Sequence, residues 1–380
     1  VGIRVFVGQR SASVASSDLS PEALAEAAAR AVAMARLAPE DMFAGLAPAD
    51  RLAHGDLPEL DIHDPSEPSA EALLDRARAA EDAARAVPGV TNSEGGGTSA
   101  GQMVMALATS TGFRGGKAGS SHSTSASVVA GTGADMQRDY AWHSSRHLAD
   151  LEDAITIGTR AGQRAVERLN PTKLDTAAMP VVFDPRVGSS LLGHLVGAIT
   201  GSAIARGTSF LKDALGTAVF APGIHIIDDP LRPRGLRSRA FDGEGLPCRR
   251  LAIIEDGVLT SWLMDAASAR QLGLAPTGHA SRGTNGPPGA GPSNLHMAPG
   301  STTPAALIAD IKRGLYVTEL IGMGVNGLTG DYSRGAGGFL IENGQITRPV
   351  AEVTIAGNLR DMFRNLVAAD DLRFRHATNV

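Results

Sequence analysis

One titratable side chain, His194, lies in an apolar pattern of three- and four-residue spacing, which predicts an amphipathic helix over 188–209. A metallopeptidase carries two histidine ligands about one turn apart on such a helix, and a glutamate beside the first activates water. Here Gly193 and Leu195 flank His194, and Ala198 follows four residues later. Two interpretations stay open: a packing helix with one histidine, or a metal helix that has lost its ligands.

Two further histidines, His143 and His147, have the four-residue spacing of metal ligands on one helix face. Their segment, YAWHSSRH, is more typical of a strand that gives way to a helix, and no glutamate adjoins either histidine. We therefore favour solvated histidines over a metal site. Nucleophilic catalysis has no support, because the chain has no G-x-S-x-G motif and Cys248 has no histidine near it in sequence.

Two glycine-rich segments resemble phosphate-binding motifs. Residues 322–327 match G-x-G-x-x-G after an expected strand, but the following LTGDYSRGAGG offers no helix on which a pyrophosphate could bind. Residues 112–117, GFRGGK, are one residue short of a Walker A loop and are followed by Ala118 instead of Ser or Thr. Neither segment predicts a nucleotide site.

Asp331, Tyr332 and Arg334 lie between glycines that allow close approach of a backbone or a ligand. One interpretation is a tight structural corner in which Asp331 pairs with Arg334. The other is a loop that contacts a peptide or a partner protein. We favour the structural interpretation and keep the three residues as candidate contacts.

The composition is that of an ordinary globular protein, with 43% hydrophobic and 20% charged residues. A formal net charge of −5 gives no basic footprint for nucleic acid. The single cysteine, Cys248, excludes an internal disulfide framework and a cysteine-cluster zinc site. We expect no membrane span, because no apolar run reaches about 18 residues.

The chain opens in a strand-like segment without Met, so we expect the natural N-terminus to be missing. A cytoplasmic protein is the default expectation.

Capping and turn signals indicate an α+β architecture instead of alternating βαβ units. We expect a multi-domain chain with antiparallel mixed sheets, packed helices and a β-rich C-terminal domain. Ser20-Pro21 should start a helix that ends near Leu37, and 277–292 should form a mobile loop. The expected units are a trimmed N-terminal α/β unit with linker (1–62), a central α+β domain (63–172) and a C-terminal domain with the His194 helix (173–380).

Several segments together resemble the TldD/PmbA family, also called modulators of DNA gyrase, and most closely its PmbA (TldE) branch. The resemblance spans nearly the whole chain, and the block 317–365 is highly specific, although both ends look trimmed against a full family member. The segments that carry it are GQRSASVASSDLS at 8–20, LLGHLVGAITG at 191–201, SFLKDALG at 209–216, FDGEGLPCRRLAIIEDGVLTSWLMD at 241–265, ARQLGLAPTGHA at 269–280, and VTELIGMGVNGLTGDYSRGAGGFLIENGQITRPVAEVTIAGNLRDMFRN at 317–365.

The resemblance implies that the TldD branch is a zinc peptidase and the PmbA branch is its partner. The TldD motif His-Glu-x-x-x-His falls here on Gly193 for the first ligand, His194 for the glutamate and Ala198 for the second ligand. That branch also uses a late cysteine, and none follows Cys248. One imidazole cannot hold a tetrahedral zinc, so zinc binding is not carried over and no cofactor is expected.

The resulting expectation is a non-catalytic subunit that pairs with a TldD-like metallopeptidase, or forms a homodimer, around an unfolded peptide substrate. One alternative is a protein that modulates gyrase or binds another partner without proteolysis. Another is a homodimer with a different metal site, built from His194 with His225 or His279.

Overall fold

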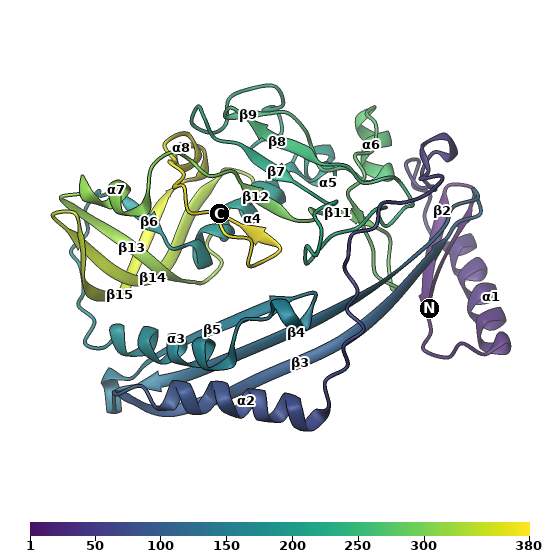
Figure 1. The fold of residues 1–380 in the computed structure, drawn as a ribbon. Helices are drawn as coiled ribbons and strands as arrows, with labels where there is room; N and C mark the ends of the chain where they lie inside the picture. Colours follow the sequence, from purple (N-terminus) through teal and green to yellow (C-terminus); the bar gives the residue numbers. More distant parts are fainter.

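The computed structural model describes residues 1–380 and has the expected α+β architecture in several packed parts (Figure 1). The N-terminal part is an antiparallel hairpin of β1 (Gly2–Val7) and β2 (Arg10–Ala15), with α1 (Pro21–Leu37) packed against both strands. The predicted start of α1 is confirmed: the Ser20 hydroxyl accepts a hydrogen bond from the Ala23 amide at 3.3 Å, and Pro21 opens the first turn.

Residues 38–69 contain a single short helical turn, η1 (Ala49–Arg51). They are nevertheless packed in place. Ala47 and Leu52 are buried with Phe113 and Phe241, and the Ser120 amide donates to the Ile62 carbonyl at 2.9 Å. The segment therefore ties the N-terminal part to both later parts of the chain.

The central part is a three-stranded antiparallel sheet in the order β3-β4-β5, with two helices side by side on one face (Figure 1). Its small-residue core lets the helices approach closely: a Cβ added at Gly158 would overlap the Ala80 carbonyl. The elements are α2 (Ala70–Arg85), β3 (Val90–Ala108), β4 (Arg114–Ala130), η2 (Gly133–Asp135), β5 (Gln137–Ser145), η3 (Leu148–Asp150) and α3 (Ala154–Glu167).

The C-terminal part holds two larger sheets, in the orders β15-β14-β13-β6 and β16-β12-β7-β8-β9. The β6–β13 and β12–β16 pairs are parallel, whereas the other strand pairs are antiparallel. The first elements are β6 (Val181–Phe183), α4 (Pro185–Ile199), α5 (Gly201–Ala205), β7 (Ile226–Asp228), β8 (Leu251–Glu255), β9 (Val258–Leu259), α6 (Ala266–Leu272), β10 (Ala280–Ser281) and β11 (Gly289–Ala290). The remaining ones are β12 (Leu295–Met297), α7 (Pro304–Ala309), β13 (Arg313–Ile321), β14 (Asp331–Glu342), β15 (Gln345–Asn358), α8 (Leu359–Arg364) and β16 (Thr378–Asn379).

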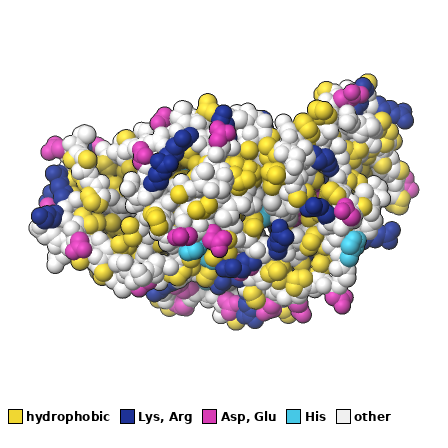
Figure 2. Space-filling view, turned by 90° about the horizontal axis from the view of Figure 1, so that it is seen from above, with side chains coloured by type: hydrophobic (Ala, Val, Ile, Leu, Met, Phe, Trp, Pro, Cys, Tyr) yellow, Lys and Arg dark blue, Asp and Glu magenta, His cyan; other side chains and the backbone are white.

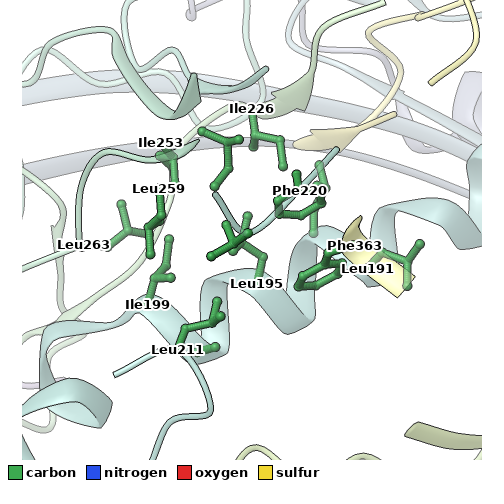
Figure 3. Close-up of a cluster of buried hydrophobic side chains, with 14 of the residues drawn as sticks. Leu191, Leu195, Ile199, Leu211, Phe220, Ile226, Ile253, Leu259, Leu263 and Phe363 are labelled. Carbon is green, nitrogen blue, oxygen red and sulfur yellow. The ribbon is translucent and has the colours of Figure 1, made fainter. Parts of the chain in front are cut away.

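Helix α4 crosses the largest hydrophobic core, which contains 23 buried residues. Leu191, Leu195 and Ile199 project from one side of the helix toward Ile226, Ile253 and other apolar side chains of this part (Figure 3). The predicted amphipathic helix is therefore correct in kind. Its bounds were wrong, because the helix begins at Pro185 and is interrupted at Thr200 before the short α5.

Three sequence-based element predictions need correction. Residues 331–342 form one long strand, β14, and not a glycine-framed corner or loop. Within 277–292, β10 pairs with β11, and His279 and Ala280 are buried, so this segment is not a wholly loose loop. The helix expected to follow the strand of YAWHSSRH directly begins only at Ala154, after the single turn of η3.

The surface seen in Figure 2 mixes Lys and Arg with Asp and Glu and shows no broad patch of one sign. No helix combines the length and apolar character needed to cross a membrane.

Candidate functional site

Helix α4 is held at its start by polar contacts. The Asp184 carboxylate accepts a hydrogen bond from the Arg186 amide at 2.9 Å and another from the Tyr316 hydroxyl at 2.9 Å. Pro185 occupies the first helical position, where no intrahelical amide bond is lost. The cap, together with the buried leucines, fixes which side chains of α4 face the rest of the C-terminal part.

The three positions aligned with the metallopeptidase motif have different surroundings. Gly193 is exposed, and a Cβ added there would meet nothing within 4 Å. Ala198 is 4% exposed and lies in the hydrophobic core. Positions five residues apart on a regular helix are separated by about 140°, which explains why one faces open space and the other the core.

His194 faces β14. Its ring contacts the Tyr332 ring edge-to-face, with centroids 5.8 Å apart, and its buried Nε2 has no hydrogen-bond partner. Burial lowers the pKa of His194, and the nearby charge of Arg334 lowers it further. The imidazole is therefore held neutral at pH 7, packed between helix and strand.

Other candidate ligands are engaged elsewhere. His279 is buried, with Nδ1 2.9 Å from the Thr277 hydroxyl and Nε2 3.2 Å from Asp228. The buried Cys248 thiol donates to the Gly278 carbonyl, and burial raises its pKa to about 12. His225 Nδ1 accepts from the Asp256 amide at 3.3 Å. No group of three or more His, Cys, Asp or Glu side chains is arranged to hold a metal ion.

The pair His143 and His147 also has structural contacts. His143 Nδ1 accepts from the Glu152 amide at 3.1 Å, and His147 Nε2 lies 3.1 Å from the Asp61 carboxylate. His143 is on β5, whereas His147 follows that strand. The two histidines are therefore not on one helix face.

A cavity of about 330 Å³ lies beside α4, between the central and C-terminal parts. It is lined from α4 by Arg186, Val187 and Ser190, from β5 and the end of α3 by Arg138, Asp139, Tyr140 and Arg168, and from β13 and β14 by Thr318, Glu319, Leu320 and Arg334.

Most charges in this cavity are paired. Asp139, 2% exposed, accepts from Arg186 at 2.7 Å and from Arg168 at 3.4 Å, and Arg168 also pairs with Glu319. Arg334 has no carboxylate within ion-pair distance. The cavity wall thus contains one uncompensated guanidinium.

A second cavity of about 480 Å³ adjoins the first and shares Tyr140 and Arg186 with it. Five arginines and three carboxylates are among its lining residues. Glu152 pairs there with Arg160 at 2.6 Å and with Arg375 at 3.4 Å. Together the cavities follow the boundary between the central and C-terminal parts.

The other two candidate contacts, Asp331 and Tyr332, differ in exposure. Asp331 is exposed and accepts from Thr329 at 2.6 Å and Asn358 at 3.1 Å, so it does not pair with Arg334. Tyr332 is 1% exposed, and its buried hydroxyl has no hydrogen-bond partner. Arg334 alone of the three lines the cavity.

Sequence reasoning did not find Asp139, Arg186, Ser190 or Thr318. These residues come from separate elements and only the tertiary fold brings them together. A usable signal was the position of Ser190, four residues before His194, which places both side chains on neighbouring positions of one helix face.

Comparison with known proteins identifies relatives over nearly the whole chain. Three family models match: "PmbA/TldA metallopeptidase domain 1" at 1–35, the central domain of the same family at 63–169, and its C-terminal domain at 176–380. A curated relative, metalloprotease PmbA of Escherichia coli O157:H7, is 41% identical over 97% of this chain and 80% of its own. The metalloprotease PmbA homolog of Haemophilus influenzae is 36% identical over 99% and 82%.

Solved structures share the fold. A putative modulator of DNA gyrase from Bacteroides thetaiotaomicron superposes with a TM-score of 0.92 at 28% identity, over 100% of this chain and 85% of that one. TldE from Thermococcus kodakarensis superposes with a TM-score of 0.85 at 24% identity, over 99% and 86%.

Proposed function

The chain belongs to the PmbA/TldD protease family, and on that basis we propose that it is a non-catalytic PmbA/TldE-type subunit of a cytoplasmic peptidase assembly. The observation that carries this proposal is the donor set on α4. Gly193 and Ala198 have no metal-binding atoms, and His194 stands where the family's TldD branch has its glutamate. These residues do not fit a zinc ion, which needs at least three protein ligands in a catalytic site.

The environment of the helix supports the same proposal. The His194 ring packs against Tyr332 and feels the positive charge of Arg334, and that charge disfavours a nearby cation. The buried Cys248 thiol stays protonated at neutral pH and is hydrogen-bonded elsewhere. The chain would therefore contribute shape and binding groups to the assembly, and a TldD-like partner would supply the hydrolytic centre.

An unfolded peptide would bind at the boundary between the central and C-terminal parts, where both cavities lie. Strand addition is a general mode for such peptides. Along the free edge of β5, however, Arg164 and Arg168 donate to the carbonyls of Tyr140 and Arg138. Side chains in the cavities would therefore take a larger share of the contacts there.

Coexpression tests the subunit role. The chain and a TldD-type metallopeptidase from one organism are expressed together with a tag on one of them. We expect stable co-purification at defined stoichiometry and hydrolysis of an unfolded peptide only by the mixture. Failure to associate, with the chain alone forming homodimers, would contradict the heteromeric assembly.

A second candidate function is modulation of DNA gyrase without proteolysis, favoured by the description of the solved Bacteroides protein as a putative modulator of DNA gyrase. Capture of gyrase, without association with a TldD-type protein, would support this candidate. The alternative metal site of His194 with His225 or His279 is not proposed further, because His279 is buried against Asp228 and His225 accepts from the Asp256 amide.

A further inference from the structure

Polar atoms without partners concentrate around the cavity beside α4. Twelve buried side-chain nitrogen or oxygen atoms in the protein have no hydrogen-bond partner. Four belong to residues that line this cavity: Arg186 Nε, Ser190 Oγ, Thr318 Oγ1 and Arg334 Nε. Buried polar groups are nearly always satisfied by protein groups, ordered water or a ligand, so this grouping makes the cavity the candidate ligand site.

The chemistry of these atoms requires a ligand that accepts hydrogen bonds. A guanidinium nitrogen can only donate, and both hydroxyls can donate by rotation. Thr318 is 7% exposed and lines the cavity. A ligand bound against the side chains of these four lining residues therefore has to present oxygen lone pairs.

The charges define the class of ligand further. Arg138 pairs with Glu94, Arg168 with Asp139 and Glu319, and Arg186 with Asp139, which leaves Arg334 as the one unpaired cation. Asp139 and Glu319 also line the cavity and oppose a second negative charge. One delocalised negative charge fits this balance, and a carboxylate matches the guanidinium geometrically.

We propose that this cavity binds a peptide carboxylate, with Arg334 as the charged anchor and Ser190 and Thr318 as neutral donors. The carboxylate comes from a free peptide C-terminus or from an acidic side chain. The site rests on the proposed function only in taking a peptide as its ligand. The isolated chain is sufficient to bind it.

Isothermal titration calorimetry at low salt tests the site on the full chain. The probes are acetyl-Ala-Ala-Ala with a free C-terminus, acetyl-Ala-Glu-Ala-amide and the neutral acetyl-Ala-Gln-Ala-amide. At least one charged probe should bind about tenfold tighter than the neutral probe, as a charge-assisted hydrogen bond predicts. The charged probe that binds more tightly identifies the source of the carboxylate, a free C-terminus or an acidic side chain. Equal binding of all three probes would overturn the proposal.

Variants assign the preference to this cavity. Arg334→Gln should abolish the roughly tenfold preference, whereas Arg348→Gln should retain it, because Arg348 is an exposed β15 residue that pairs with Glu342 at 3.5 Å. Ser190→Ala and Thr318→Val each remove one neutral donor and should weaken binding several-fold, which keeps the test decisive if Arg334→Gln does not fold. A preference that survives the removal of Arg334, or of both hydroxyls, would refute the assignment.

The binding and association experiments have separable outcomes. Co-purification with a TldD-type protein without any charge preference would overturn the carboxylate site alone. A charge preference in a chain that binds no such partner would overturn the assembly alone.

Discussion

His194 illustrates how one residue determines what α4 can do. At the position that the family resemblance aligns with a glutamate of the TldD branch, this chain has an imidazole that packs edge-to-face against Tyr332 and feels the charge of Arg334. Its lowered pKa follows first from burial and then from Arg334. The residue therefore acts as a neutral packing group beside the cavity.

Removing the Arg334 charge should make His194 easier to protonate. In Arg334→Gln we expect the pKa of His194 to rise, while burial keeps it below the ordinary histidine value. An NMR titration of the histidine rings, assigned with His194→Asn, measures this change. An unchanged His194 titration, matching that of Arg348→Gln, would show that Arg334 does not act on this imidazole.

Glu244 gives a separate pH effect. Burial raises its pKa from 4.5 to about 7, although the hydrogen bond that its carboxylate accepts from the Ala266 amide, at 2.7 Å, acts in the opposite direction. Between pH 4.5 and 7 the folded chain therefore binds more protons at this group than the unfolded chain, and its contribution to stability falls as pH rises. The raised pKa corresponds to about 3 kcal/mol.

Glu244→Gln should remove this contribution. We expect the free energy of unfolding of the variant, relative to the parent, to increase by about 3 kcal/mol from pH 4.5 to pH 8 in urea denaturation. Glu59→Gln, at an exposed position, is the control and should stay within about 0.5 kcal/mol of the parent throughout. A parallel profile for Glu244→Gln and the control would refute the burial effect.

At the scale of elements, α4 is placed by its leucines. Leu195 is fully buried in the largest core, so Leu195→Ala should lower the free energy of unfolding by about 2–5 kcal/mol. Leu74→Ala on α2, where the side chain is 49% exposed, is the matched control and should cost far less. Equal losses for the two variants in chemical denaturation would contradict the packing described for α4.

Sequence reasoning succeeded for elements with strong local signals. The start of α1 follows from its Ser20 cap and Pro21. Sequence reasoning failed for β14, because the glycines of this strand resemble those of a loop. A Cβ at Gly338 would overlap the Tyr316 carbonyl on the neighbouring strand, so that glycine serves close strand approach, which only the tertiary structure reveals.

In the candidate site, too, local sequence signals reveal some residues and only the tertiary structure reveals the others. The aligned positions Gly193, His194 and Ala198 could be read locally, since they share one helix. The residues that surround them could not be found in this way, because Thr318 and Arg334 lie more than a hundred residues further along the chain, on β13 and β14. Long-range pairing of strands decides which side chains surround His194, and no local pattern encodes it.

At the scale of the whole molecule, Asp139 joins two parts of the chain. It is on β5, and it pairs with Arg168 after α3 and with Arg186 on α4. Asp139→Asn leaves two largely buried arginines without their shared carboxylate, so we expect a loss of about 3–5 kcal/mol. Unfolding in urea measures it.

The control for that variant is Glu94→Gln, which removes the exposed partner of Arg138, 3.4 Å away. Exposed ion pairs contribute about 0–1 kcal/mol, so this variant should remain close to the parent. If Asp139→Asn is no less stable than Glu94→Gln, the buried pairs do not hold the central and C-terminal parts together.

We propose above all that this chain lends a binding surface to a peptidase and does not itself hold the catalytic zinc. The most direct test combines elemental analysis of the purified chain with a peptide-hydrolysis assay, with and without a TldD-type partner. We predict far less than one zinc per chain, no chelator-sensitive hydrolysis by the chain alone, and activity in the mixture. One zinc per chain, together with chelator-sensitive cleavage by the chain alone, would contradict the account.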